Sequence, residues 1–426
     1  MNKADNELLT RVGPGTPMGD LLRRFWMPAL IESELAQADG PPIRLRLLGE
    51  DLIAFRDTQG RIGILAANCP HRQAGLYFGR NEENGLRCVY HGWKFDTTGA
   101  CVDMPSEPRG EQMKQHVRAT SYPCFVRGGV IWIYMGPPEL SPEPPDLEWI
   151  RVPGDQAATT KRLQECNWAQ AVEGGIDSSH ISFLHRDDMD LMKAAHLSLS
   201  EQTNPVFDVK QTNGGLLIGA RRMARDGRHL WRVHQYLVPF YQMIPATLKD
   251  TEDSSELYYA GHVWVPIDDE NTWTWTFACN PHRAMTADEK ARYGSDHLYR
   301  GMLDERYHPL SHRGNDYGLD RRLQKTTSFT GIPGLANQDA AIQESMGRIV
   351  DRTKEHLGTS DAGPAAFRRL ILSLARDLQN GKEPDAAQNG AWYNVRSASF
   401  LLPPEVPFDK GGAHLFSTSE IEKTAG

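Results

Sequence analysis

The chain has 426 residues, of which 39% are hydrophobic and 24% are charged; this is the composition of a globular protein, so a disordered chain is excluded. Its formal net charge of -8 argues against nucleic acid or an anionic membrane as a partner, because both attract basic surfaces. Six cysteines in so long a chain are too few for a disulfide scaffold.

The N-terminal segment is polar. Residues 1–10 lack the apolar core of a secretory signal, and no apolar run in the chain has the length of a membrane span. We therefore expect a cytoplasmic protein without a membrane partner. Residues 16–30 predict a short helix, in which Thr16 is the N-cap and Pro17 takes the first helical position.

Strands are predicted next along the chain. Residues 43–69 alternate apolar and polar side chains and have turn residues at 57–60, which predicts an antiparallel hairpin that leads into Cys69. Residues 93–104 predict a second hairpin. The apolar run at residues 129–136 predicts a buried strand that closes a small β domain.

A proline-rich stretch at residues 137–150 has the composition of a linker. We therefore expect a lead-in at residues 1–40, a β domain at residues 41–140 and a second domain at residues 141–426.

The second domain combines several predicted strands with helices. The helices are expected at residues 286–303, from Asn337 onward and at residues 364–381. Strands that are gathered together, with helices grouped around them, favour an α+β fold over a doubly wound one. Neither a glycine-rich nucleotide motif after a strand nor a P-loop occurs, so we do not expect this chain to bind NAD or ATP itself.

Two predicted loops carry metal-ligand pairs, Cys69 with His71 and Cys88 with His91. Two thiolates and two imidazoles suit either one tetrahedral zinc ion or a Rieske [2Fe-2S] cluster, in which both cysteines bind one iron and both histidines the other. A zinc finger takes two histidines as its second pair, whereas each loop here supplies one Cys and one His. This arrangement favours the cluster, with structural zinc as the alternative. The other cysteines are expected to be core thiols: Cys101, Cys124, Cys166 and Cys279.

A second group of possible ligands contains Asp177, His180 and His185. Two histidines five residues apart beside an Asp are, on their own, more often a satisfied helix face than a metal site. A redox cluster in the same chain implies an electron acceptor, however. Two histidines and one carboxylate form the facial triad of non-haem Fe(II) oxygenases, which leaves positions open for O2.

Together with residues 315–361, these motifs make the whole chain resemble the oxygenase subunits of Rieske non-haem iron aromatic-ring hydroxylases, in the phthalate dioxygenase-like branch. The resemblance implies an N-terminal antiparallel β Rieske domain, followed by a helix-grip catalytic domain made of an antiparallel sheet and helices. It also implies that His180, His185 and Asp339 bind a mononuclear Fe(II), with Glu344 as the fallback for the carboxylate.

The resemblance gives Asp177 a different role from that of a ligand. In this family the Asp of the motif bridges the mononuclear site to a Rieske histidine of the neighbouring subunit. Asp177 would then accept hydrogen bonds from His180 and from His91 of another chain. The implied assembly is a homotrimer, or a hexamer made of two such rings.

The activity implied by the resemblance is that of the oxygenase component of a two-component dioxygenase. A separate NADH-dependent reductase, with a flavin and a ferredoxin-type cluster, would supply electrons, and the substrate would be an aromatic carboxylate that is cis-dihydroxylated, phthalate first among them. A monooxygenase or O-demethylase acting on a methoxy- or phenoxybenzoate is the alternative. A non-catalytic Rieske electron carrier is a more remote one.

A carboxylate substrate calls for an arginine, whose planar fork makes two charge-assisted hydrogen bonds. Arg221 and Arg222 are neighbours on a predicted strand, so their side chains leave opposite faces and only one of them can point into a pocket. Arg232, on the next predicted strand, is a third candidate.

Overall fold

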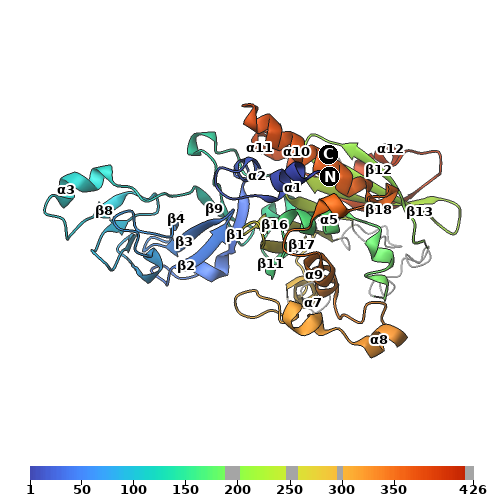
Figure 1. The fold of residues 1–426 in the computed structure, drawn as a ribbon, viewed down its shortest axis with the longest axis horizontal. Helices are drawn as coiled ribbons and strands as arrows, with labels where there is room; N and C mark the ends of the chain where they lie inside the picture. Colours follow the sequence, from blue (N-terminus) through green and yellow to red (C-terminus); the bar gives the residue numbers. More distant parts are fainter. Residues whose placement is uncertain (188–201, 246–257, 295–300, 418–426) are drawn as a thin grey trace. The chain divides into compact units, whose positions relative to one another are not determined.

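The computed structural model describes residues 1–187, 202–245, 258–294 and 301–417 (Figure 1). The chain forms two compact units. The first is Val12–Pro142, and the second combines Met1–Arg11 with Glu143–Gly426. The expected lead-in at residues 1–40 is therefore divided between the two units.

The first unit contains three small antiparallel sheets. In order of pairing, their strands are β2 (Ile43–Leu47), β3 (Glu50–Arg56) and β4 (Ile62–Ala66); β1 (Met27–Ile31), β10 (Val130–Ile133) and β9 (Cys124–Arg127); and β5 (Arg80–Glu82), β6 (Gly85–Arg87), β7 (Lys94–Phe95) and β8 (Cys101–Asp103). The β3–β4 hairpin turns where predicted, because the Asp57 carboxylate accepts the backbone N–H groups of Gln59 and Arg61. The loops after β4 and β6 carry the two Cys/His pairs.

The predicted helix at residues 16–30 is shorter in the structure. Helix α2 (Pro17–Leu22) begins as expected, with the Thr16 hydroxyl accepting the Gly19 N–H at 3.2 Å. It ends before Phe25, and Met27–Ile31 pairs with β10 instead. Pro28 is incompatible with a helix interior, and the buried apolar run around it suits a strand.

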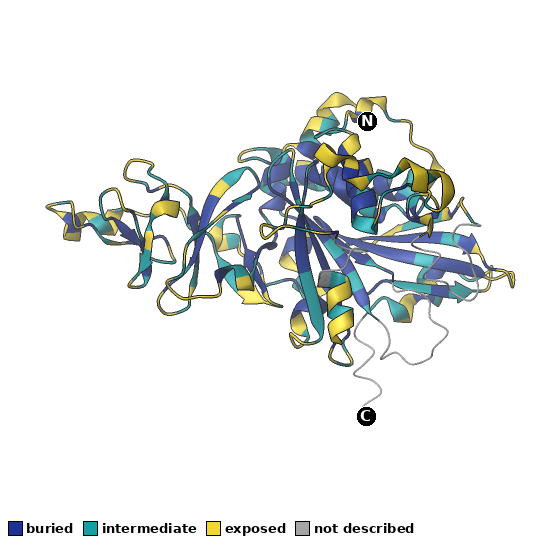
Figure 2. Cartoon of the chain, turned by 90° about the horizontal axis from the view of Figure 1, so that it is seen from below, coloured by how far each residue is buried: buried dark blue, intermediate teal, exposed yellow. Residues whose placement is uncertain are grey.

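One large antiparallel sheet dominates the second unit. Its strand order is β11-β17-β16-β15-β14-β13-β12, and β18 also pairs with β14. The strands are β11 (Ala157–Gln164), β12 (Val206–Gln211), β13 (Gly215–Met223), β14 (His229–Leu237), β15 (Tyr241–Ile244), β16 (Tyr259–Pro266), β17 (Thr272–Cys279) and β18 (Ala398–Leu402). Figure 2 shows that these strands are largely buried, whereas the helices around them carry exposed outer faces. The α+β fold expected from the sequence is confirmed.

Helices lie on both faces of this sheet. The α-helices of the described chain are α1 (Lys3–Thr10), α2, α3 (Gly110–Met113), α4 (Glu148–Arg151), α5 (Trp168–Ile176), α7 (Ala287–Gly294), α8 (Arg321–Thr326), α9 (Leu335–Ser345), α10 (Ala362–Gln379), α11 (Asp385–Gln388) and α12 (Phe408–Gly411). On one face, α5 packs on β15, β16 and β17, and α10 packs on β12 and β13. On the other, Trp149 of α4 stacks on Phe277 and Phe408 of α12 stacks on Trp231.

The predicted helices of the second unit are present, with shifted ends. The first keeps its capping box, since Thr286 and Glu289 bond each other's backbone N–H groups; the middle of the predicted range, residues 295–300, lies outside the described residues. The helix predicted from Asn337 is α9, which begins at Leu335 after Gly334 with φ 84°. The third is α10.

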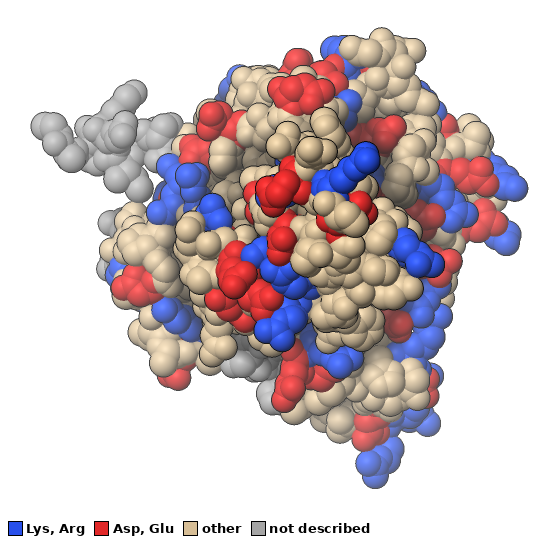
Figure 3. All heavy atoms as spheres, turned by 90° about the vertical axis from the view of Figure 1, so that its left-hand side faces the viewer, with Lys and Arg blue, Asp and Glu red and all other residues tan. Residues whose placement is uncertain are grey.

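Charges of both signs lie side by side on the face of the molecule seen in Figure 3. In the first unit, ion pairs such as Arg87–Asp103, at 2.7 Å, bring opposite charges together. No helix among the described residues is long and apolar enough to cross a membrane.

Candidate metal centres

The loop that holds Cys69 and the loop that holds Cys88 make the same turn. In each, the cysteine N–H donates to the carbonyl five residues later, and the cysteine carbonyl accepts from the N–H four residues later. That fourth residue has a positive φ in both loops, 60° at Gln73 and 78° at Gly92. The two loops are built alike, and each contributes one thiol and one imidazole.

The four expected ligands of these loops separate into an inner and an outer pair. The thiols of Cys69 and Cys88 are buried in the core of the first unit. His71 is exposed and His91 is partly exposed, and their ring centroids lie 4.5 Å apart. The ring of Trp93 stacks on His71 at 4.2 Å, which holds that imidazole in place. Two inner thiols and two outer imidazoles match the donor set of a Rieske cluster.

A single zinc ion fits these donors less well. A single ion needs at least three Cys, His, Asp or Glu side chains whose ligand atoms lie close together. Among the described residues, His180, His185 and Asp339 form such a group, and it includes no residue of either Cys/His loop. Burial, with a smaller contribution from the neighbouring Cys88, raises the pKa of the Cys69 thiol to about 11. A bound metal would have to displace this proton, as metals bound by thiolates do.

The second centre joins two separate parts of the second unit. Residues Asp177–His185 follow the end of α5, with His180 in a short 3-10 helix, and Asp339 lies in α9. His185 Nε2 lies 3.1 Å and His180 Nε2 3.7 Å from Asp339 Oδ1. The ligand atoms of all three residues lie within 4.8 Å of one another. Two imidazoles and one carboxylate that converge on one point are the donors of a facial triad.

The charge state of Asp339 suits a metal ligand. Burial acts to raise the pKa of this carboxyl, but the charge of His185, its hydrogen bond and the charge of His180 outweigh burial and hold the pKa at about 2. Asp339 is therefore ionised at neutral pH. Glu344, the fallback ligand, is engaged elsewhere: its carboxylate accepts the Tyr317 hydroxyl at 2.6 Å and the Glu165 N–H at 3.1 Å.

Hydrogen bonds to the far side of each ring orient the two histidines. His185 Nδ1 lies 2.7 Å from Gln338 Oε1, and the Gln338 amide nitrogen donates to the Ile332 carbonyl, so that Oε1 is the atom left to accept. His180 Nδ1 lies 3.4 Å from Asp177 Oδ2. Both partners are acceptors, which places the proton on Nδ1 and leaves each Nε2 free to bind a metal.

Replacing Gln338 by Leu is expected to weaken iron binding by about tenfold to a hundredfold, because His185 loses the acceptor that fixes its proton on Nδ1. Chelator competition measures this affinity. Gln324→Leu is the matched control, since among the described residues the Gln324 amide bonds only the exposed Arg321. Equal iron affinity in the Gln338 variant and the wild type would contradict the role given to Gln338.

Asp177 is held as a charged group at the C-terminal end of α5. Its Oδ1 accepts the Ser179 N–H at 2.6 Å, and Oδ2 faces His180. Burial raises the pKa of this carboxyl, but the hydrogen bond and charge of His180 lower it by more, as do backbone N–H groups. A quarter of its side chain stays exposed, so the carboxylate has one face toward His180 and another open.

Two glycines allow α5 to approach its neighbours closely. A Cβ on Gly174 would lie 2.1 Å from the Gln343 side chain in α9, and one on Gly175 would lie 2.1 Å from the Trp264 ring in β16. A larger residue would push α5 away from α9 at position 174, or away from β16 at position 175, and would move Asp177 away from the triad.

The strand register places polar side chains in a row across the face of the sheet that α5 covers. Cross-strand partners share a face, and residues two apart on a strand do so as well. These rules put on one face Arg222 of β13, Arg232 and His234 of β14, Gln242 of β15, His262 of β16, Thr276 of β17 and Thr160 of β11. Sequence reasoning singled out the arginines but not His234, Gln242 or His262, although His234 follows Arg232 at strand spacing.

Arg222 and Arg221 leave opposite faces of β13, as expected. Arg222 is buried, and its Nη2 donates to the Ser178 carbonyl at 2.8 Å, within the segment that joins Asp177 to His180. Its Nη1 has no hydrogen-bond partner among the described residues. Arg221 pairs across strands with Trp231 on the other face.

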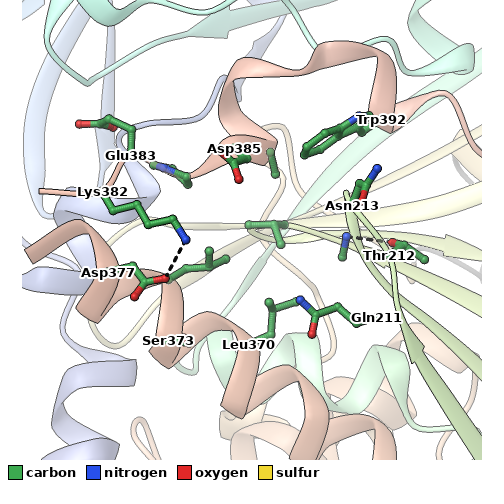
Figure 4. A pocket seen from close by; sticks show the side chains of 15 residues that line it. Gln211, Thr212, Asn213, Leu370, Ser373, Asp377, Lys382, Glu383, Asp385 and Trp392 are labelled. Atoms are coloured by element: carbon green, nitrogen blue, oxygen red, sulfur yellow. Dashed lines mark hydrogen bonds and ion pairs between the residues drawn. The ribbon is translucent and has the colours of Figure 1, made fainter. Parts of the chain in front are cut away.

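A hollow of about 280 Å³ on the second unit lies apart from these residues (Figure 4). Its wall includes Asp377 and Lys382, which form an ion pair at 3.6 Å. The labelled side chains come from the end of β12 and the turn after it, from α10, and from the segment that follows α10 up to Trp392. It contains no residue of either centre.

The two units match separate families. Residues 25–123 match the Rieske [2Fe-2S] domain, and residues 133–406 match the family described as LigXa C-terminal domain like.

Similar proteins cover nearly the whole chain. It is 38% identical over 422 residues to the 3-chlorobenzoate-3,4-dioxygenase oxygenase subunit of Comamonas testosteroni, which covers 95% of this chain and 96% of that protein. It is 37% identical over 392 residues to the phthalate 4,5-dioxygenase oxygenase subunit of Pseudomonas putida, and the match covers 89% of this chain and 87% of that protein. It is 31% identical over 407 residues to the 5,5'-dehydrodivanillate O-demethylase oxygenase subunit of a Sphingobium strain, and the match covers 91% of this chain and 83% of that protein.

Solved structures share the fold at low identity. Dicamba monooxygenase bound to 3,6-dichlorosalicylic acid superposes with a TM-score of 0.59 and 18% identity, over 85% of this chain and 99% of that one. The oxygenase in a ferredoxin complex of carbazole 1,9a-dioxygenase superposes with a TM-score of 0.57 and 18% identity, over 89% of this chain and 98% of that one.

Proposed function

We propose, since this chain belongs to the Rieske non-haem iron oxygenases as an oxygenase subunit of the phthalate dioxygenase-like branch, that it uses O2 to cis-dihydroxylate an aromatic carboxylate, phthalate being the first to test. Its cofactors are a Rieske [2Fe-2S] cluster and a mononuclear iron. The observation that carries the proposal is the gathering of His180, His185 and Asp339 around one point beside the polar face of the sheet.

The residues divide the work between the two centres. We assign Cys69, His71, Cys88 and His91 to the cluster, and His180, His185 and Asp339 to the iron. When bound, the cluster supplies single electrons and the iron supplies the place where O2 is activated. The chain's own part is to keep Asp339 ionised, to keep the proton of each triad histidine on Nδ1 and to hold the substrate beside the triad.

Asp177 is proposed to link the two ligand sets across neighbouring copies of the chain. Its Oδ2 already faces His180, and the exposed part of the carboxylate is available to accept a hydrogen bond from His91 of another copy. The surface around His91 supports a contact there, because Val89 and Tyr90, which directly precede it, are each more than half exposed. A homotrimer, alone or stacked as a hexamer, would make this contact in every copy.

Electrons come from a separate partner in this proposal. The similar proteins are oxygenase subunits by name, and one structural relative was solved with a ferredoxin. The partner proposed here is an NADH-dependent reductase with a flavin and a ferredoxin-type cluster.

Arg222 is the arginine proposed to bind the substrate carboxylate, because its Nη1 is a buried cationic donor beside the segment that carries His180. Arg222→Gln is expected to raise KM for the carboxylate by about tenfold to a hundredfold. Steady-state kinetics with phthalate measure the change, and the visible Rieske spectrum should stay intact. Arg221→Gln, on the opposite face, is the matched control. An unchanged KM for the Arg222 variant would contradict carboxylate capture by this arginine.

A second candidate function is monooxygenation or O-demethylation of a methoxy- or phenoxybenzoate. The observation in its favour is the similarity to an O-demethylase oxygenase subunit, which spans most of the chain. The two reactions differ in product: a dihydrodiol carries two oxygen atoms from O2, whereas demethylation yields a phenol and formaldehyde. Product analysis on a panel of benzoates therefore separates them.

A further inference from the structure

A buried histidine on the polar face of the sheet has one ring nitrogen that the protein does not use. His234 of β14 is only 3% exposed. Its Nδ1 lies 2.7 Å from Gln242 Nε2, but its Nε2 has no hydrogen-bond partner among the described residues. A buried donor or acceptor left without a partner is destabilising, so its retention calls for a reason.

Gln242 determines which nitrogen of His234 carries the proton. The Gly175 carbonyl can only accept, so the Gln242 atom that faces it must be the amide nitrogen. The same nitrogen donates its second hydrogen to His234 Nδ1, which must then be the unprotonated nitrogen of the ring. The proton of the neutral imidazole consequently sits on Nε2, and the unused atom is a hydrogen-bond donor.

The surroundings keep this imidazole neutral. Burial is the largest cause that lowers the pKa of His234 far below its usual value, and the charges of Arg232, His180 and Arg222 lower it further. His234 shares this face of the sheet with Arg222, and the charge of His180 acts on its ring. Gly175, whose carbonyl accepts from Gln242, is in the last turn of α5, two residues before Asp177.

We infer that His234 is a substrate-positioning residue, whose Nε2–H donates a hydrogen bond to an acceptor oxygen of the aromatic substrate held beside the triad, and that Gln242 keeps His234 in the donating tautomer. The inference rests on the proposed oxygenase function and deepens it. A neutral donor binds one oxygen of a carboxylate or the oxygen of a hydroxyl or ether without adding charge. With the cationic Arg222 Nη1 on the same face, it suits a carboxylate most, because each oxygen then receives a donor.

Two variants of His234 separate loss of the donor from loss of the ring. In His234→Asn, the shorter amide still accepts from Gln242 at the place of Nδ1 but cannot reach the place of Nε2. In His234→Gln, the longer amide can put an N–H near the place of Nε2. We expect the Asn variant to raise KM for phthalate by about tenfold to a hundredfold with little change in kcat, and the Gln variant to recover most of that loss. Peroxide formed per NADH should rise in the Asn variant, since a loosely held substrate is oxidised less often.

A third variant tests the tautomer. Gln242→Met leaves His234 in place but removes the donor to Nδ1, so KM should rise by less than in His234→Asn. The double variant should be no worse than His234→Asn alone, because both changes remove the same hydrogen bond to substrate. If the two increases in KM multiply in the double variant, Gln242 does not act through His234, and this part of the inference is contradicted.

The wild-type enzyme separates failure of this inference from failure of the proposed function. If the wild type, loaded with both metals and a reductase, oxidises no member of a benzoate panel, the proposed function fails before His234 is tested. If the wild type is active and His234→Asn keeps its KM and coupling, the inference is wrong while the function stands. Equal losses in the Asn and Gln variants would also overturn it, because the ring would then serve packing and not donation.

Discussion

Replacing Asp177 by Asn is expected to lower coupled turnover by about a hundredfold while both metals stay bound. The backbone N–H of Ser179 donates to Asp177 Oδ1, and an Asn would keep its oxygen there. The amide nitrogen of the Asn would then replace Oδ2 and face His180 Nδ1–H, so that two hydrogen-bond donors would oppose each other. The variant loses both the acceptor for His180 and the negative charge proposed to meet His91 of a neighbouring copy. NADH-driven product formation, with iron and sulfide analysis, measures the effect.

The control for this experiment is Asp187→Asn, since Asp187 lies in the same segment but its carboxylate accepts only the Phe329 N–H among the described residues. Its turnover should stay close to that of the wild type. Near-normal coupled turnover in Asp177→Asn would remove the proposed link between the two ligand sets.

Asp339→Ala should abolish binding of the mononuclear iron and reduce turnover to background. The variant deletes the single carboxylate of the triad and leaves His180 and His185, which would have to bind Fe(II) as two neutral ligands. The Rieske ligands lie in the other unit, so the visible spectrum and the acid-labile sulfide should be unchanged. Metal analysis after gel filtration measures the iron that remains.

Glu344→Gln is the matched control for Asp339, because both are carboxylates of α9 but Glu344 is bound to Tyr317 and to the Glu165 N–H. This variant should keep its iron. Loss of iron from Glu344→Gln together with full iron in Asp339→Ala would mean that the fallback ligand is the true one.

Local pattern in the sequence predicts the first centre almost completely. The spacing of Cys69 and His71, and of Cys88 and His91, requires only that each pair lie on one short loop. The residues around them favour such loops, since Gly92 takes a positive φ without strain and the hairpin before Cys69 has its own turn signal at Asp57. What the sequence could not show is that both loops make the same turn, because Gln73, at the position equivalent to Gly92, is not a residue typical of positive φ.

The second centre depends on contacts between distant segments. His180 and His185 were candidates from their spacing, but Asp339 was chosen only through the family resemblance, because many carboxylates precede or begin helices. Gln338 and His234 were missed. The role of Gln338 follows from the orientation of one helix turn, and that of His234 from the register that brings β15 beside β14. Helix α2 shows the same limit: it ends earlier than predicted because Met27–Ile31 pairs with the distant strand β10.

The measurement that tests the central claim most directly is turnover with 18O2, NADH and a phthalate-type reductase on a panel of benzoates, with products identified by mass spectrometry. The account predicts a dihydrodiol of an aromatic carboxylate that carries two labelled oxygen atoms. A singly labelled phenol with formaldehyde from a methoxybenzoate would establish the demethylating alternative in its place. Absence of label from every product, in protein shown to hold both the cluster and the mononuclear iron, would contradict the assignment of this triad as an oxygenase centre.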